Sequence, residues 1–348
     1  MATDIVIGLQ YGDEGKGKIV NFLAQQNQYD YCLRYNGGAN AGHTIYFNDK
    51  KIVTHQIPSG IVRGLKCIIG DNCYVDAVKL KEEVIMLEEA GISVYSNLYI
   101  SNKCHYIEDK HINYDKNNNR IGTTCSGIGP VARDKYFRVG NRVMDDINRL
   151  NFLPKKCIID VSELLFKHYQ EKTSFARILV EGAQGYGLDI THGDYPYVTS
   201  SHCISTDCLN LGIPIKSIGK VWGVAKIYET YVGAKEFQDI GDATLKKLQV
   251  EGEEFGATTG RPRQCNYLDL NKLYISCWVN NITHLVINKC DIIEKIGVYQ
   301  LYDTNDDGIS MNIRFEDLNE MKSYIYSNIR NKIPFIKDII FSDNPIGI

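Results

Sequence analysis

The sequence lacks several features that would assign it to a broad class at once. None of its eleven cysteines is spaced C-x-x-C with another, which argues against a zinc knuckle or a redox pair. No stretch approaches the roughly 18 apolar residues of a membrane-spanning helix, and the opening residues, MATDIVIGLQYGDEG, have neither the basic segment nor the long apolar run of a secretion signal. With a net charge of only −3, the chain has no global attraction to nucleic acid or anionic membrane. We therefore expect a cytoplasmic protein with reduced cysteines, in which any anion binding comes from local groups.

Repeats and a proline- or serine-rich linker are also missing, so we expect residues 1–348 to form one domain. Apolar runs typical of buried strands, such as residues 4–10 and 283–289, alternate with segments of helical spacing, such as 76–91 and 316–333. This alternation predicts an α/β fold with a large, mostly parallel central sheet flanked by helices. The low-complexity stretch DKNNNR, residues 115–120, is expected to be a surface loop.

The segment GDEGKGKI, residues 12–19, matches a phosphate-binding loop except at one position. Gly12, Gly17 and Lys18 fit the pattern G-x-x-x-x-G-K. A strand-like run precedes the segment and a helix-like run follows it, and the N–H groups at the start of a helix attract phosphate. The next residue is Ile19, which lacks the hydroxyl that normally binds Mg²⁺.

Two carboxylates of the same loop could replace that hydroxyl. Asp13 and Glu14 lie beside the expected phosphates, and Mg²⁺ prefers hard oxygen ligands with substrate phosphate completing its shell. Lys16 and Lys18 would add positive charge. The alternative is a glycine-rich turn with solvated charges.

A second motif points to guanine. Asn288-Lys289-Cys290-Asp291, which follows a strand-like run, fits N-K-x-D. The carboxylate of Asp291 can accept hydrogen bonds from the ring N–H and the exocyclic amine of guanine. Adenine would instead leave that carboxylate facing a lone pair, which costs about 1–3 kcal/mol or more. The alternative is an aspartate that caps a turn.

Four further stretches, residues 34–44, 121–138, 180–201 and 256–265, combine glycine with polar side chains. Their candidate ligand groups are Asn40, His43, Thr123, Thr124, Ser126, Arg133, Lys135, Arg138, Gln184, Thr199, Thr258, Thr259, Arg261 and Arg263. The second stretch suits a phosphate, and the threonines and arginines of the last suit a small carboxylate. For residues 34–44 the alternative is a structural histidine, and for residues 180–201 and 256–265 it is a polar surface loop.

Taken in order, the motifs GDEGKGK, NAGHT, IGTT, EGAQG…YPYVTSS, GATTGRPR and NKCD resemble those of the adenylosuccinate synthetase family, from residue 5 to about residue 345. That family joins IMP to L-aspartate while it hydrolyses GTP to GDP and phosphate, with Mg²⁺. The resemblance implies a P-loop-NTPase-like fold with GTP-binding features. It also implies two steps: GTP phosphorylates the 6-oxygen of IMP, and the amine of aspartate then displaces that phosphate.

The resemblance also implies a role for each matching position. Asp13 would bind Mg²⁺ and remove the N1 proton of the purine, His43 would act as an acid, and Gln184 would complete the catalytic set. The backbone carbonyl of Gly42 would join Asp13 in the metal shell. The implied GTP contacts are Gly12, Glu14, Gly15, Lys16, Gly17, Lys18, Gly42, Thr44, Arg263, Lys289, Asp291 and Ser342. The implied IMP contacts are Asp13, Lys16, Asn40, Thr124, Arg138, Gln184, Thr199 and Arg261, and those to aspartate are Thr258, Thr259, Arg261 and Arg263.

Arg138 stands where the family reaches into the IMP site of a neighbouring subunit, which implies a homodimer. The chain is short for the family, because the helical excursion usual near residues 140–160 is nearly absent, as in compact archaeal and phage-type members. Other departures are Tyr231 where arginine is usual, Lys235-Glu236 for a Gly-Pro pair, and Pro262 and Gln264 for two arginines.

Three alternatives stay open. The first is the same chemistry on dGMP, but the phage relatives that use dGMP usually replace the loop aspartate by a smaller residue, so Asp13 favours IMP. The second is a GTP-binding switch protein, which would need Ser or Thr at position 19 and a D-x-x-G segment. No Asp of this chain is followed by Gly three residues later. The third is an inactive or repurposed relative.

Overall fold

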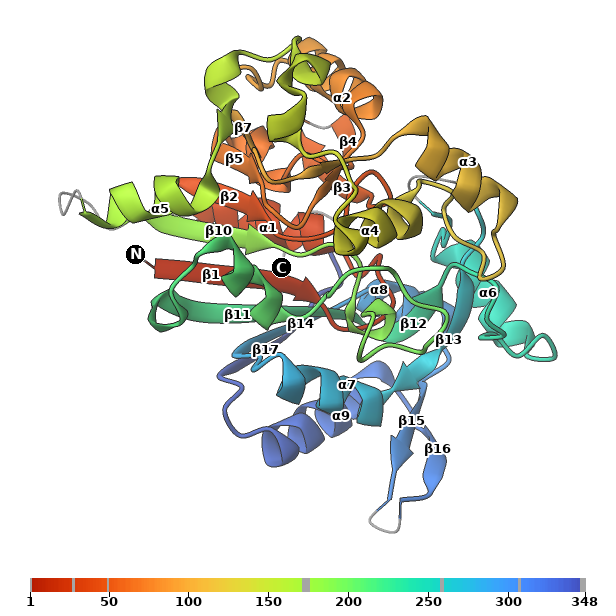
Figure 1. The fold of residues 1–348 in the computed structure, drawn as a ribbon. Coiled ribbons are helices and arrows are strands. Elements are labelled where there is room, and N and C mark those ends of the chain that lie inside the picture. Colours follow the sequence, from red (N-terminus) through yellow and green to blue (C-terminus); the bar gives the residue numbers. More distant parts are fainter. Residues whose placement is uncertain are drawn as a thin grey trace.

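A large parallel sheet organises the chain (Figure 1). The computed structural model describes residues 2–26, 29–48, 50–170, 176–256, 260–305 and 308–344. Among these residues the sheet has nine strands, in the spatial order β17 (Asp338–Phe341), β14 (His284–Asn288), β11 (Ile218–Lys226), β1 (Ala2–Gly8), β10 (Arg177–Glu181), β2 (Tyr31–Arg34), β5 (Lys66–Ile69), β7 (Leu98–Ser101) and β9 (Ile158–Ile159). All pairings within it are parallel. The predicted α/β class is confirmed.

Helices cover both faces of this sheet. Successive residues of a strand point to opposite faces. Ile5 and Ile7 of β1 enter one apolar core, whereas Val6 between them enters the other. The first core is completed by α5 (Val161–Gln170), α7 (Leu270–Val279), α8 (Cys290–Ile296) and α9 (Leu318–Lys332), and the second by α1 (Lys16–Gln26) and α2 (Ala77–Glu89). Burial on both faces explains why the central strands read as continuous apolar runs.

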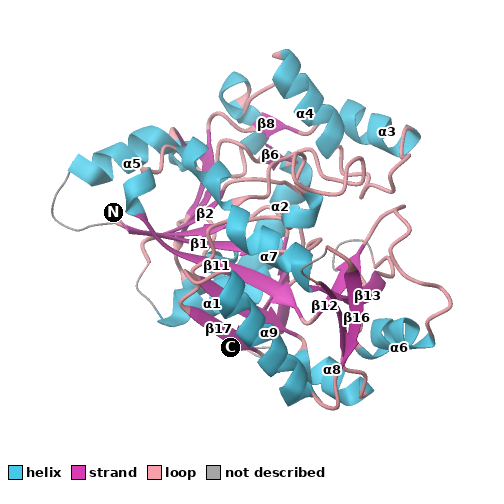
Figure 2. Ribbon diagram, turned by 90° about the horizontal axis from the view of Figure 1, so that it is seen from below, coloured by secondary structure: helices cyan, strands magenta, loops and turns pink. Residues whose placement is uncertain are grey.

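Smaller elements gather near the carboxyl ends of the central strands, on the side toward which β1 points in Figure 1. A mixed sheet there lies beside α6 (Figure 2). It consists of β12 (Tyr228–Tyr231), β13 (Gln264–Asp269), β15 (Gln300–Thr304) and β16 (Ser310–Arg314), and α6 spans Ala243–Glu251. The remaining elements are β3 (His43–Phe47), β4 (Lys50–Thr54), β6 (Tyr74–Val75), β8 (His105–Tyr106), α3 (Asp109–Asn117) and α4 (Ile128–Phe137).

The expectation of a loop over residues 115–120 is wrong in its first half. Helix α3 continues to Asn117, and Asp115 is buried within it. The carboxylate of Asp115 accepts hydrogen bonds from Thr123 Oγ1 at 2.8 Å and from the backbone N–H of Gly127 at 2.9 Å. These tertiary contacts stabilise helix in a stretch whose composition favours a loop.

The region expected to be reduced, residues 140–160, contains three short 3₁₀ helices and the brief strand β9, with the helices at Val143–Asp145, Ile147–Leu150 and Lys155–Cys157. Further 3₁₀ helices lie at Ser59–Arg63, Tyr186–Leu188, Ser205–Leu211 and Ile215–Ser217. The assignment of the whole chain to one domain stays a prediction.

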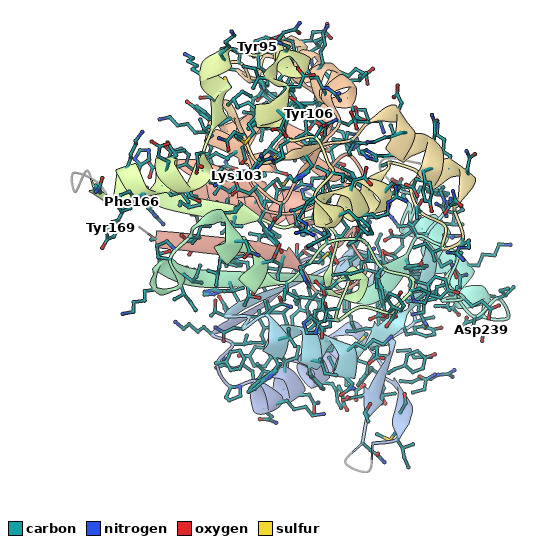
Figure 3. All side chains as sticks on the ribbon, viewed as in Figure 1. Tyr95, Lys103, Tyr106, Phe166, Tyr169 and Asp239 are labelled. Atoms are coloured by element: carbon teal, nitrogen blue, oxygen red, sulfur yellow. The ribbon has the colours of Figure 1, made fainter. Side chains whose placement is uncertain are left out.

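The opposite end of the sheet carries α5, from which Phe166 and Tyr169 project with more than half of their surface exposed (Figure 3). Within the described ranges, no helix combines the length and apolarity needed to cross a bilayer. All eleven cysteines are free, and only Cys125 is not buried.

Candidate active site

Two cavities meet where β1 ends and α1 begins. Cavity A, of about 250 Å³, is lined by residues that include Asn40, Thr123, Thr124, Gln184, Thr199 and Tyr231. Cavity B, of about 270 Å³, is lined by residues that include Lys18, Thr44, Arg263, Asn288, Lys289 and Asp291. Both cavities are lined by Asp13, Lys16, Gly42 and His43. These four residues, called the shared wall below, therefore face two ligand-sized spaces at once.

The loop between β1 and α1 holds its own second carboxylate. Glu14 is buried and accepts hydrogen bonds from the backbone N–H groups of Gln10 (3.2 Å) and Gly12 (2.9 Å) and from Lys16 Nζ (2.6 Å). Because its carboxylate is used inside the loop, Glu14 is poorly placed to bind a metal ion. Asp13 is then the loop carboxylate open to both cavities.

Asp13 has a strained backbone. Its φ of 60° lies in the left-handed region that non-glycine residues seldom adopt, and such strain tends to occur at functional positions. Its Oδ2 accepts a hydrogen bond of 2.8 Å from Arg263 Nε.

The donor set of the shared wall fits a magnesium ion that takes most of its ligands from elsewhere. Among the described residues, no three His, Cys, Asp or Glu side chains cluster as metal ligands. The wall offers the carboxylate of Asp13 and the backbone of Gly42. Mg²⁺ is commonly held by one or two carboxylates, with phosphate and water completing its shell.

His43, the first residue of β3, is oriented by a buried carboxylate. Its Nδ1 lies 2.5 Å from Oε1 of Glu181, the last residue of β10. Glu181 also accepts hydrogen bonds from Ser59 N at 2.6 Å and Ser59 Oγ at 2.5 Å. Burial lowers the pKa of His43 despite the attraction of Glu181. Burial opposes ionisation of Glu181, but the hydrogen bonds from His43 and Ser59 and the positive charge of Arg34 outweigh it and lower the pKa of Glu181 to about 2. A neutral imidazole therefore donates Nδ1–H to an ionised carboxylate, which leaves Nε2 for a ligand.

The N-K-x-D segment is tied to the phosphate-type loop. Asn288 ends β14, and its Nδ2 donates to the backbone carbonyl of Glu14 at 2.7 Å. Lys289 has a φ of 68° and donates from Nζ to the carbonyl of Gly252 at 3.0 Å. Lys289 and Asp291 both line cavity B. The hydrogen bond of Asn288 thus fixes the position of the N-K-x-D segment relative to Asp13.

Lys18 closes another side of cavity B. Its Nζ donates to Ser342 Oγ at 3.0 Å and to the carbonyl of Asn344 at 2.8 Å. Burial lowers the pKa of Lys18 to about 8, although the negative charge of Asp291 opposes the shift. Ser342 is itself buried, and its hydroxyl holds the ammonium of Lys18 at the wall of cavity B.

Cavity A contains a buried amide oxygen that has no hydrogen-bond partner within the described protein. Gln184 has a φ of 55°, and its Oε1 is buried without a hydrogen bond. Arg261 lies behind the same cavity and donates from Nη1 to the carbonyls of Gly122 (3.0 Å) and Thr123 (3.1 Å). Because a buried acceptor costs free energy unless it is satisfied, Gln184 is suited to a ligand that donates a hydrogen bond.

The departures at residues 231–235 are linked in space. The rings of Tyr11 and Tyr231 pack edge to face with centroids 5.9 Å apart, and the hydroxyl of Tyr11 donates to Asp194 at 2.8 Å. Lys235 forms an ion pair with Asp194, and its Nζ lies 5.3 Å from the centroid of the Tyr11 ring. The ammonium of Lys235 therefore lies against the ring of Tyr11, which packs on Tyr231, the position where the family pattern has an arginine. Gln264 accepts from the backbone N–H of Phe237 at 2.9 Å and supports the same segment.

Three predicted phosphate ligands do not reach either cavity. Arg133 forms an ion pair with Asp134, and Lys135 donates to Asn72 Oδ1 at 2.8 Å. Arg138 is exposed at the end of α4. Residues 128–137 form a helix on which both side chains contact other partners, and the role of Arg133 and Lys135 as phosphate ligands stays a prediction. Thr258 and Thr259 lie outside the described residues.

Two buried acids of the site were not singled out from the sequence. Glu181 orients His43, and Glu254 contacts Arg263 Nη1 at 2.5 Å. Glu181 ends a strand just before a glycine-rich stretch, a position that could have drawn attention to it. Nothing in the local sequence distinguishes Glu254 from a surface acid.

Comparisons with known proteins show the family to which the chain is similar. A family model described as adenylosuccinate synthetase matches residues 5–156 and 146–330. The adenylosuccinate synthetase of Thermodesulfovibrio yellowstonii is 39% identical over 337 residues, which cover 85% of this chain and 79% of the relative. The adenylosuccinate synthetase of Cytophaga hutchinsonii is 39% identical over 345 residues, and the match covers 86% of this chain and 80% of the relative.

Solved structures show the same likeness. Fully ligated adenylosuccinate synthetase from Plasmodium falciparum matches with a TM-score of 0.83 and 28% identity, over 98% of this chain and 97% of that one. The succinoaminodeoxyadenylate synthetase of cyanophage S-2L, bound to dGMP and dATP, matches with a TM-score of 0.75. This match covers 99% of this chain and 93% of that one. Its identity is only 19%, so this second likeness concerns the fold alone.

Proposed function

The chain belongs to the adenylosuccinate synthetase family, and from that premise we propose that cavity A binds IMP while cavity B binds GTP. As a member of this family the protein is a GTP-dependent ligase of purine nucleotide biosynthesis, which joins L-aspartate to IMP to give adenylosuccinate, GDP and phosphate. The observation that carries the proposal is the shared wall. A phosphoryl group passing from one nucleotide to the other must cross the place where both cavities meet, and Asp13, Lys16, Gly42 and His43 line that place from both sides.

Asp13 acts as the base in this proposal. Its carboxylate faces both cavities and takes the N1 proton of the purine, which makes the 6-oxygen nucleophilic toward the terminal phosphate of GTP. Phosphoryl transfer depends mainly on alignment and charge neutralisation. Lys16, which is also part of the shared wall, supplies positive charge beside the migrating group.

His43 stabilises the migrating phosphoryl group through Nε2. The imidazole is neutral while the site is empty, because burial lowers its pKa. An incoming phosphate anion favours the protonated form, and Glu181 provides the opposite charge on Nδ1. The proton on Nε2 is then directed at an oxygen of the transferring group, where negative charge accumulates.

Magnesium would be held by Asp13 and the backbone carbonyl of Gly42. When bound, the ion neutralises phosphate charge and keeps Asp13 ionised. In the ligand-free protein, Arg263 already neutralises the Asp13 carboxylate, so this side chain has to move aside. Thr258, Thr259, Arg261 and Arg263 would receive L-aspartate.

In this proposal guanine is bound by Asp291 and Lys289, which line cavity B. The carboxylate of Asp291 would accept from the ring N–H and the amine of guanine, and the aliphatic stem of Lys289 would support the ring.

IMP is the purine substrate favoured over dGMP. The cyanophage structure contains dGMP, but its likeness to this chain concerns the fold alone. The chain keeps Asp13, and it is more similar to the Plasmodium enzyme in both TM-score and identity. An assay with Mg·GTP, L-aspartate and either IMP or dGMP tests the assignment by the mass of the succinyl product. We expect product from IMP, and product from dGMP alone would overturn the choice.

The homodimer is proposed from the surface around Arg138. Tyr136 and Phe137 are each 73% exposed and Val139 is 65% exposed, which places three large apolar side chains in solvent beside Arg138. Contiguous exposed apolar side chains mark interaction sites. A second copy that covers them would bring Arg138 toward the IMP phosphate of its partner. We also propose a cytoplasmic location, for which eleven free thiols are suited to a reducing compartment.

A further inference from the structure

A chain of alternating charges ends at the shared wall. Lys226 and Glu254 are fully buried, and Lys226 Nζ lies 3.3 Å from both carboxylate oxygens of Glu254. Arg263 donates from Nη1 to Glu254 at 2.5 Å and from Nε to Asp13 at 2.8 Å. The hydroxyl of Tyr228 donates to Glu254 Oε1 at 2.6 Å. The order of charges is therefore positive, negative, positive and negative, ending at Asp13.

Glu254 and Arg263 are also joined through their backbones, beside residues that line the cavities. The backbone N–H of Arg263 donates to the carbonyl of Glu254 at 2.9 Å, and Phe255 pairs with Pro262 in an antiparallel bridge. Phe255 lines cavity B, whereas Gly256 lines cavity A. Glu254 is thus the buried attachment point of a segment that contacts both substrate spaces.

The balance of charge changes when Asp13 is engaged elsewhere. With Arg263 on Asp13, the four charges cancel. Once Asp13 turns to the metal and the purine, the Nε of Arg263 loses its acceptor. Lys226, Glu254 and Arg263 then carry one net positive charge at the border of cavity B. Glu254 still holds one edge of the guanidinium, so the other edge is free to meet an anion.

We propose that Glu254 is a positioning residue that holds Arg263 so that its guanidinium can change partner, from Asp13 in the empty protein to the terminal phosphate of bound GTP. This inference rests on the proposed function of cavity B. It assigns Glu254 no contact with substrate. Its consequence is that the loss of the Glu254 charge affects ligands with a third phosphate and spares those without it.

The test is calorimetric binding of a non-hydrolysable GTP analogue and of GDP, each with Mg²⁺, to the whole protein. Glu254→Gln keeps the size of the side chain and removes its charge. Tyr228→Phe is the matched control, because it removes one hydrogen bond to the same carboxylate and leaves its charge in place. Arg263→Gln and the double variant with Glu254→Gln complete a cycle that isolates the coupling between the two residues.

We expect Glu254→Gln to lower the affinity for the GTP analogue roughly tenfold, as for the loss of one charge-assisted contact. The affinity for GDP should change less than about twofold. Tyr228→Phe should bind both ligands like the wild type. In the Arg263→Gln background, Glu254→Gln should have no further effect. Equal weakening of both ligands, the same effect in both backgrounds, or unchanged binding of the analogue would each overturn the proposal.

A second variant keeps the proposal testable if Glu254→Gln fails to fold. If Glu254→Gln leaves Lys226 uncompensated and the protein unfolds, Lys226→Met combined with Glu254→Gln removes one buried charge of each sign, a change that buried pairs often tolerate. The same selective loss of analogue binding is expected. A wild-type protein that binds neither nucleotide would overturn the proposed function itself, whereas one that binds both, with no selective loss in the variants, would overturn only the role of Glu254.

Discussion

At the residue scale, two adjacent carboxylates have different roles, and this difference explains how the loop can bind its ligands without a hydroxyl at position 19. Glu14 is buried and bonded to the loop itself, while Asp13 adopts a left-handed backbone and faces both cavities. The side chain of Ile19 is buried in the core behind the sheet, which is where an apolar residue is stabilising. In our proposal Asp13 takes the place of the missing metal ligand.

Lys18 provides a test by pH. Burial lowers its pKa to about 8, so the ammonium is charged at pH 7 and largely neutral at pH 9 in the free protein. A neutral amine no longer attracts the phosphates of GTP. The affinity for GTP, measured by calorimetry, should therefore decline as the pH rises through about 8.

The matched variant for this prediction is Lys18→Arg, whose guanidinium stays charged over the whole range. Its affinity for GTP should change little between pH 7 and pH 9. An identical decline in both proteins would show that another group titrates.

At the element scale, the pattern of strands and helices could be predicted because strands that are buried on both faces of a parallel sheet consist of continuous apolar residues. The strands at residues 2–8 and 284–288 and the helix at 77–89 follow the expectation closely. Helix α3 departs from it, since Asp115 is buried by contacts with Thr123 and Gly127 that local composition does not reveal.

In the site, too, local sequence indicates some residues but does not reveal contacts with distant parts of the chain. The residues of the shared wall lie in glycine-rich motifs, so the sequence indicates them. Arg133 and Lys135 carry the expected charge but lie on a helix that directs them elsewhere. Glu181 and Glu254 act through side chains that are distant in sequence, and no local pattern encodes such a contact.

The role of Asp115 gives a prediction for α3. Asp115→Ala removes both hydrogen bonds that hold the turn at residues 122–127, which lines cavity A. We expect a loss of stability of about 1–3 kcal/mol, measured by denaturant unfolding. We also expect KM for IMP to rise clearly more than KM for GTP, because Asp115 lies on cavity A alone. Equal changes in the two constants would contradict this assignment.

At the scale of the whole molecule, the exposed apolar surface around Arg138 suggests that one chain does not make a complete IMP site. Tyr136→Ser combined with Phe137→Ser should shift the protein toward monomer in light scattering and raise KM for IMP. Phe166→Ser with Tyr169→Ser is the control, because these aromatic residues are similarly exposed on α5 at the other end of the sheet. A fully active monomer would refute the dimeric site.

The central claim is that a phosphoryl group crosses the shared wall beside Asp13. It is tested most directly with GTP labelled with ¹⁸O in the bridge between the β- and γ-phosphates, incubated with IMP and Mg²⁺ in the absence of L-aspartate. Reversible transfer to IMP frees the β-phosphate to rotate, so the label should move to non-bridging positions. This movement should require IMP and should vanish in Asp13→Ala, while that variant still binds GDP. Label movement without IMP, or its persistence in Asp13→Ala, would contradict the account.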